Sequence, residues 1–84
     1  MARQFQLEIL SLNERIFSGA ISSLVMPAEE GYWGVLAGHM PSIAKLKEGK
    51  VRARINGEEK EWIIKGGYAW VEREKTVLLV ELGG

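Results

Sequence analysis

The side chains that could do chemistry are few, and their spacing does not assemble an active site. His39 is the only histidine, so it could act as a general base but could not share a metal ion with a second histidine. The adjacent carboxylates Glu29–Glu30 and Glu58–Glu59 point apart in a strand or turn, so sequence alone does not make them acid–base pairs. A small hydrolase using His39 beside two glutamates stays a hypothesis without a visible nucleophile, base and orienting group.

A glycine-rich segment, residues 31–38, carries two aromatic side chains. Its glycine spacing fits neither a dinucleotide-binding fingerprint nor a P-loop, and no long helix follows that could hold phosphate at its N-terminus. We therefore expect these glycines to serve tight turns and close packing. Tyr32 and Trp33 either contact a partner or pack over the end of the domain, whereas Trp62 and Trp70 are expected in the core. A free-standing module that binds glycans or peptides through Tyr32 and Trp33 is a second hypothesis.

Strands must position these residues, because the dominant pattern has a period of two. Apolar residues alternate with polar ones over residues 5–9 and 51–55, and residues 76–82 form a richer apolar run that indicates a more fully buried strand. Residues 20–26 and 62–65 are similar but less regular, and 41–47 is a weak helical candidate. Turn signals between these runs predict one all-β sandwich or barrel domain spanning residues 1–84.

Asn56–Gly57 is the sharpest local signal. The pair suits a two-residue type I′ hairpin, in which both residues take positive φ. That turn places Arg54 opposite Glu59 and Arg52 opposite Glu61. Each such pair contributes about 0.2–1 kcal/mol. Lys50, Arg52 and Arg54 look like a basic stripe in the sequence. In the predicted hairpin, two of the three are neutralised by these partners.

Composition excludes several classes of function. The 84 residues include 11 basic and 11 acidic side chains, so the chain lacks the positive excess of a nucleic-acid binder or a polybasic membrane anchor. There is no cysteine, which excludes disulfides and cysteine-based metal sites. No segment approaches the roughly 18 apolar residues that cross a bilayer, so we expect any membrane association to be indirect.

Five segments, in order along the chain, resemble the ε subunit of F-type ATP synthase, specifically its N-terminal β-sandwich domain. The most specific is Pro27–Pro41, which resembles the signature segment of that family. The family's opening strand, its Phe-Ser-Gly, its Gly-Gly-aromatic stretch and its last strand are matched by residues 5–11, 17–19, 66–72 and 76–80.

The resemblance implies a flattened, ten-stranded antiparallel β-sandwich, here without the C-terminal helical hairpin of the family. It implies a non-catalytic rotor-stalk subunit with no cofactor or metal, which links the γ subunit to the c-ring and couples proton flow to ATP synthesis. The implied location is peripheral, on the cytoplasmic face of the bacterial inner membrane, with the plastid thylakoid as the alternative. By motif match, partner contacts fall to Ser11, His39 and Ser42 towards γ, and to Glu30, Gly31 and Tyr32 towards the ring, with Trp33 beside them.

Two residues depart from the family pattern. Tyr32 replaces the acidic residue usual after the first signature glycine, which exchanges a charged contact for an apolar or single hydrogen-bond contact. Ala37 replaces the usual proline before Gly-His, which removes a fixed φ from that turn.

Overall fold

The structure is a computed structural model that describes residues 3–83. These residues form eight β-strands and no helix, so no helix is present there to span a membrane. The strands are β1 (Phe5–Leu10), β2 (Arg15–Ile21), β3 (Ser23–Ala28), β4 (Gly31–Val35), β5 (Ser42–Leu46), β6 (Gly49–Ile55), β7 (Glu58–Val71) and β8 (Lys75–Leu82).

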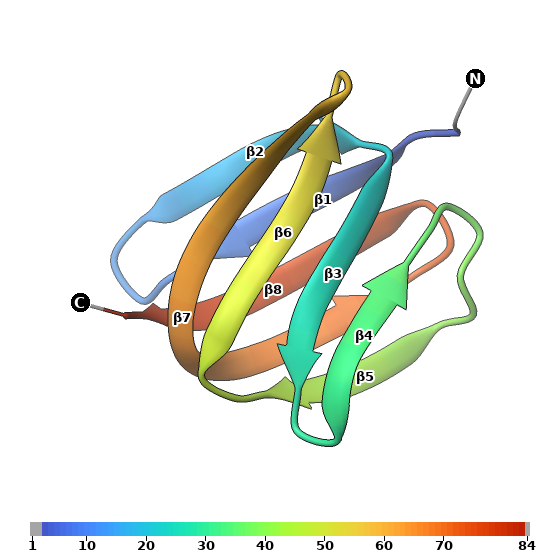
Figure 1. The fold of residues 1–84 in the computed structure, drawn as a ribbon. Coiled ribbons are helices and arrows are strands. Elements are labelled where there is room, and N and C mark those ends of the chain that lie inside the picture. The colour runs from blue at the N-terminus through green and yellow to red at the C-terminus, as the bar shows by residue number, and fades with distance from the viewer. Residues whose placement is uncertain (1–2, 84) are drawn as a thin grey trace.

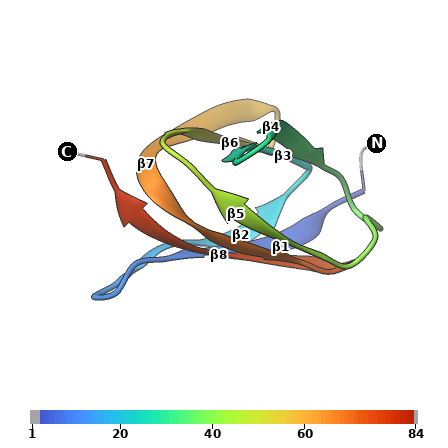
Figure 2. The ribbon, with the colours of Figure 1, turned by 90° about the horizontal axis from the view of Figure 1, so that it is seen from below.

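The strands form one mixed sheet that folds over on itself into two layers (Figures 1 and 2). One layer holds β2, β1, β8, the C-terminal half of β7 and β5. The other holds the N-terminal half of β7 with β6, β3 and β4. The long strand β7 bends from one layer into the other, and β3 meets β5 at Ala28 and Leu46. The all-β sandwich prediction is therefore confirmed.

Two details of the predicted fold are corrected. The sheet is not wholly antiparallel, because β1 pairs parallel with β8 from Gln6–Lys75 to Leu10–Leu79. Eight strands, rather than ten, are present over residues 3–83. One reason is that Gly66–Gly67, a pair typical of turns, lies inside β7, where the ladder to β8 is only irregular.

Gly67 lies in the part of β7 where the strand passes from its pairing with β6 to its pairing with β5. Its φ is +150°, and a Cβ at this position would overlap the Leu79 carbonyl oxygen and lie 2.9 Å from the Val80 Cα. Only glycine allows both this conformation and this approach to β8. A glycine that marks a turn by sequence therefore serves a close strand contact in the fold.

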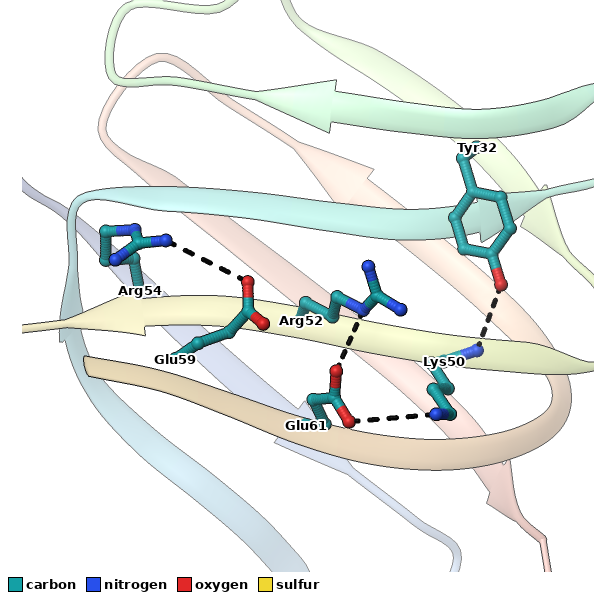
Figure 3. Close-up of polar contacts among 6 residues, drawn as sticks. All are labelled: Tyr32, Lys50, Arg52, Arg54, Glu59 and Glu61. Carbon is teal, nitrogen blue, oxygen red and sulfur yellow. Dashed lines mark hydrogen bonds and ion pairs between the residues drawn. The ribbon is translucent and has the colours of Figure 1, made fainter. Parts of the chain in front are cut away.

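The Asn56–Gly57 hairpin has the predicted register. Asn56 and Gly57 have φ of 52° and 82°, and β6 pairs with β7 from Ile55–Glu58 to Gly49–Ile64. The Arg52 Nε atom lies 2.9 Å from a Glu61 carboxylate oxygen, and Arg54 and Glu59 approach to 4.0 Å (Figure 3). The outer side of this layer is therefore a charged and solvated face.

The weak helical prediction for residues 41–47 is wrong. Residues 42–46 form β5, which pairs with β7 along its whole length. Leu46 faces the core, whereas Ile43 and Lys45 point outward. A seven-residue helix is marginal because its first turn is costly to nucleate, and the strand gains a full ladder instead.

The core lies between the two layers and is almost wholly aliphatic. Its fully buried side chains include Leu7, Ile9, Ile21, Leu24, Met26, Ile64 and Leu78. One polar group is buried with them: among the described residues, the Thr76 hydroxyl has no hydrogen-bond partner. A dry, close-packed interior of this kind makes the domain a stiff body.

Candidate partner-binding surfaces

Several exposed apolar side chains lie together on the outer side of the layer formed by β1, β8, β7 and β5. We name it the apolar outer face, and it consists of Ile43, Tyr68, Trp70, Val77 and Leu79. The ladder places Ile43 opposite Trp70 and Trp70 opposite Val77, while Tyr68 lies opposite Leu79. Ile43 is 71% exposed and Trp70 is 41% exposed. Contiguous exposed apolar side chains of this kind mark protein–protein interaction sites.

Charged side chains surround this face. Lys45 lies beside Tyr68, and Lys75 forms an ion pair with Glu8 at 3.9 Å. An apolar centre with a polar rim is the usual anatomy of a protein interface. The outer side of the opposite layer differs, because ion pairs between β6 and β7 cover it (Figure 3).

The apolar outer face was not predicted from the sequence. Trp70 was expected in the core, and that prediction is wrong, since its side chain points outward from β7. Residues 76–82 were expected to be more fully buried, but Leu79 and Leu82 are exposed. The apolar residues on both sides of this strand could have indicated the exposed face. One side of the strand faces the core, and the other side is exposed to a partner. Trp62, by contrast, packs partly buried against the core as predicted.

The β3–β4 hairpin carries four of the predicted site residues: Glu30, Gly31, Tyr32 and Trp33. Glu29 and Glu30 form its turn, and Gly31 begins β4 with a φ of +137°. Tyr32 is 60% exposed, but its side chain lies back across β3 instead of extending from the tip (Figure 3). The Lys50 backbone N–H donates to the Tyr32 hydroxyl at 3.4 Å. Glu30 and Gly31 therefore form the exposed tip, with Tyr32 held on the charged face.

Trp33 is half-buried and packs against the core. The His39 ring meets it edge-on, with centroids 5.4 Å apart and planes at 87°. This geometry favours packing over the domain end, which was one of the two roles left open for Trp33. A glycan-binding platform of Tyr32 and Trp33 is not favoured, because the two rings lie on opposite sides of β4.

His39 and Ser42 lie together at one end of the domain. The Ser42 hydroxyl donates to the Met40 carbonyl oxygen at 3.0 Å, and His39 Nδ1 lies 2.7 Å from the same oxygen. A carbonyl oxygen can only accept, so this contact is a hydrogen bond when Nδ1 carries a proton. Beside them, Leu36 and Met40 are highly exposed.

Ser11 directly follows β1. The β1–β2 turn lies at the opposite end of the domain from the β4–β5 loop (Figure 1). Its hydroxyl donates to the Glu14 carbonyl oxygen at 3.4 Å. The neighbouring Leu12 is 92% exposed. The structure thus brings His39 and Ser42 together, but places Ser11 at the far end of the same layer.

An open depression of about 380 Å³ lies between the edge strands β4 and β5. Its lining combines apolar side chains with the charged groups of the hairpin turn and β5: Ala28, Trp33, Ile43 and Ala44 with Glu29, Glu30 and Lys45. Within residues 3–83, no group of three histidine, aspartate or glutamate side chains is placed to hold a metal ion.

The fold and these surfaces define a β-sandwich domain of the kind that binds other proteins. Residues 4–82 match the family described as "ATP synthase, Delta/Epsilon chain, beta-sandwich domain", so the chain belongs to that family.

Curated relatives carry the name ATP synthase epsilon chain. The chain is 39% identical over 82 residues to that of Dichelobacter nodosus, covering 96% of this chain and 57% of the relative. It is 38% identical over 80 residues to that of Chlorobaculum tepidum, covering 94% of this chain and 91% of the relative. The chain thus spans a little over half of some relatives and nearly all of others.

Solved structures also resemble the fold. A chain of the Euglena gracilis mitochondrial ATP synthase, in a structure that includes its c-ring, matches with a TM-score of 0.86 and 25% identity. That match covers 92% of this chain and 50% of the other. A chain of the Tetrahymena thermophila enzyme matches with a TM-score of 0.77 at 11% identity, which shows the shared fold alone.

Proposed function

We propose that this chain is a non-catalytic subunit of the rotor stalk of a proton-translocating ATP synthase. In this role it joins the γ subunit to the c-ring, so that ring rotation driven by protons is transmitted to the catalytic head. Membership of the delta/epsilon family and the epsilon-chain names of its relatives support the assignment. The similar Euglena chain comes from a structure that includes a c-ring.

The observation that carries this proposal is the apolar outer face. A domain of 84 residues has little apolar surface to spare, yet Ile43, Tyr68 and Trp70 remain exposed on one side of one layer. Covering such a face removes apolar area from water, which contributes about 25 cal/mol per Å². We assign it to γ because its aromatic and aliphatic content suits a lasting interface.

The predicted γ contacts flank this face. His39 and Ser42 lie at the β5 end of the layer, and Ser11 lies at the far end beyond β1. An interface running along the layer would meet all three, with Met40 and Leu12 as exposed apolar neighbours. Glu30, Gly31 and Tyr32, on a separate hairpin, are proposed to face the ring.

Two separate surfaces on one rigid body suit a mechanical coupling. Contacts at both surfaces act together, because binding at one surface raises the effective concentration of the partner at the other surface. The proposed location is peripheral, on the cytoplasmic face of the bacterial inner membrane, with membrane contact only through the complex. Bacterial relatives support this location over a plastid one.

Retention of the tagged chain by a γ–c-ring complex tests the proposal. Trp70→Ser and Ile43→Ser should each weaken retention, with Trp70→Ser reaching about thirtyfold if the side chain is an interface hot spot. Ile63→Ser is the matched control, because Ile63 is an exposed isoleucine that lies off the apolar outer face. Equal retention of all three variants would overturn the assignment of this face, and no retention of the unaltered chain would overturn the function.

A further inference from the structure

We propose that the free edge of β4 accepts an extended peptide segment of a partner protein as an added strand, with a basic side chain of that segment beside Glu30. This proposal goes beyond the stalk role, because it states which backbone groups of β4 bind the partner and which charge the partner carries. It shares Ile43 with the apolar outer face, and Glu30 and Tyr32 with the hairpin proposed to face the ring. Variants at Gly34, which belongs to neither set, test it separately.

The hydrogen-bond directions around β3 show which groups of β4 are free. The Pro27 carbonyl accepts from the Lys47 N–H at 2.9 Å, so Pro27 directs its backbone towards β5. Successive residues of a strand direct their backbone groups to opposite sides. Ala28 and Met26 therefore face β4, where their partners are Gly31 and Trp33.

The same alternation fixes the outward groups of β4. Since Gly31, Trp33 and Val35 pair inward with β3, the N–H and C=O of Tyr32 and Gly34 point away from the sheet. Over residues 3–83, β3 is the only strand that pairs with β4. An edge of this kind is a template for a further strand.

Access to this edge is open. Gly34 is exposed, and a Cβ built there would meet no atom within 4 Å. Tyr32 does not cover the edge, because its ring lies back across β3 towards Lys50 (Figure 3). The depression between β4 and β5 adjoins the edge and offers Trp33 and Ile43 to apolar side chains of the added strand.

Charge favours a basic segment at the hairpin end. Glu29 is already engaged by Lys45 at 3.6 Å. Glu30 is exposed, and among the described residues no basic side chain lies within ion-pair distance of it. The lining of the depression holds two glutamates and one lysine, so a cation is the complementary charge.

Gly34→Pro is the sharpest variant, and Gly34→Ala is its matched control. Proline removes the outward N–H at an edge position where a sheet tolerates it, whereas alanine keeps the N–H. Loss of this hydrogen bond should weaken peptide binding at least about threefold. Glu30→Gln should weaken binding of a lysine-containing peptide by about two- to fivefold and reduce its salt dependence.

The probe is the blocked peptide acetyl-Thr-Val-Lys-Val-Thr-Val-Lys-amide, titrated into the isotopically labelled 84-residue chain and followed by NMR. The amides of Tyr32 and Gly34 should shift and become protected from hydrogen exchange. Two N-methylated versions of the peptide, blocked at alternate residues, separate backbone pairing from side-chain contact. One version should bind and the other should not, because only one side of the added strand faces β4.

Several results would overturn the proposal. These are absence of binding at millimolar peptide, shifts confined to the apolar outer face, and equal affinity of folded Gly34→Pro and Gly34→Ala. Equal binding of both N-methylated peptides would also overturn it. Concentration-dependent shifts without peptide would identify a second copy of this chain as the occupant instead. Retention by the γ–c-ring complex is a separate measurement, so either proposal can fail alone.

Discussion

Replacing Gly67 by alanine is expected to destabilise the domain more than any other single methyl addition on β7. The new Cβ would overlap the Leu79 carbonyl oxygen and lie 2.9 Å from the Val80 Cα, and both atoms belong to the β8 backbone. The φ of +150° is also one that an L-residue rarely adopts. Neither strain can be relieved by turning a flexible side chain.

The size of the effect follows from these two terms. The unfavourable backbone conformation costs about 1–3 kcal/mol. Displacing β8 enough to accept the methyl group weakens one or two ladder hydrogen bonds, each contributing about 0.5–1.5 kcal/mol net. The sum is about 1.5–6 kcal/mol, a large part of the roughly 4–13 kcal/mol expected for a domain of this size.

Urea unfolding followed by tryptophan fluorescence provides the assay. At a slope of about 1.5 kcal/mol per molar, the midpoint for Gly67→Ala should fall by about 1–4 M. Gly34→Ala is the control, because its Cβ would meet no atom within 4 Å, and its midpoint should stay within about 0.3 M of the unaltered chain. A Gly67→Ala midpoint as high as that of Gly34→Ala would refute the close approach of β7 and β8 on which the reasoning depends.

Three further changes test other parts of the fold. Thr76→Val should raise the free energy of unfolding by about 1 kcal/mol, because the buried hydroxyl has no partner among the described residues; a loss of stability would indicate a hydrogen bond not described here. A double-mutant cycle on Arg52 and Glu61 should give a coupling of about 0.2–1 kcal/mol that shrinks at high salt, and a salt-independent value would argue against an exposed ion pair. Asn56→Ala should cost about 1 kcal/mol by thermal unfolding, because alanine tolerates a φ of 52° less well, whereas an unchanged Tm would contradict the type I′ turn.

Part of the candidate site was open to prediction, and part was not. The glycine-rich segment and its aromatic residues could be located by type and spacing, and they do lie at one end of the domain. The exposed face of Ile43, Trp70 and Leu79 could not be located, because it forms only when β5 pairs with the distant strand β7 and β8 pairs with the other edge of β7. The role of Ser11, His39 and Ser42 as partner contacts stays a prediction.

Local chemistry alone determined the features that depend on neighbouring residues. Asn56–Gly57 sets its own turn, and the register of β6 and β7 follows from it residue by residue. The two-residue alternation in β1 fixed which of its side chains are buried, because one side of that strand is apolar. The order of motifs along the chain was enough to identify the family.

Tertiary structure alone decided the long-range pairings and what they leave exposed. The parallel contact of β1 with β8 joins segments about 70 residues apart, and no local pattern encodes it. Gly67 indicates a turn by type, but becomes a close contact only when β8 packs against it. The size of Trp70 favours a core position in the sequence. Its side chain points outward, because Ala69 and Val71 occupy the inward positions of β7. A strand has two sides, and only the assembled layers determine which one faces the core.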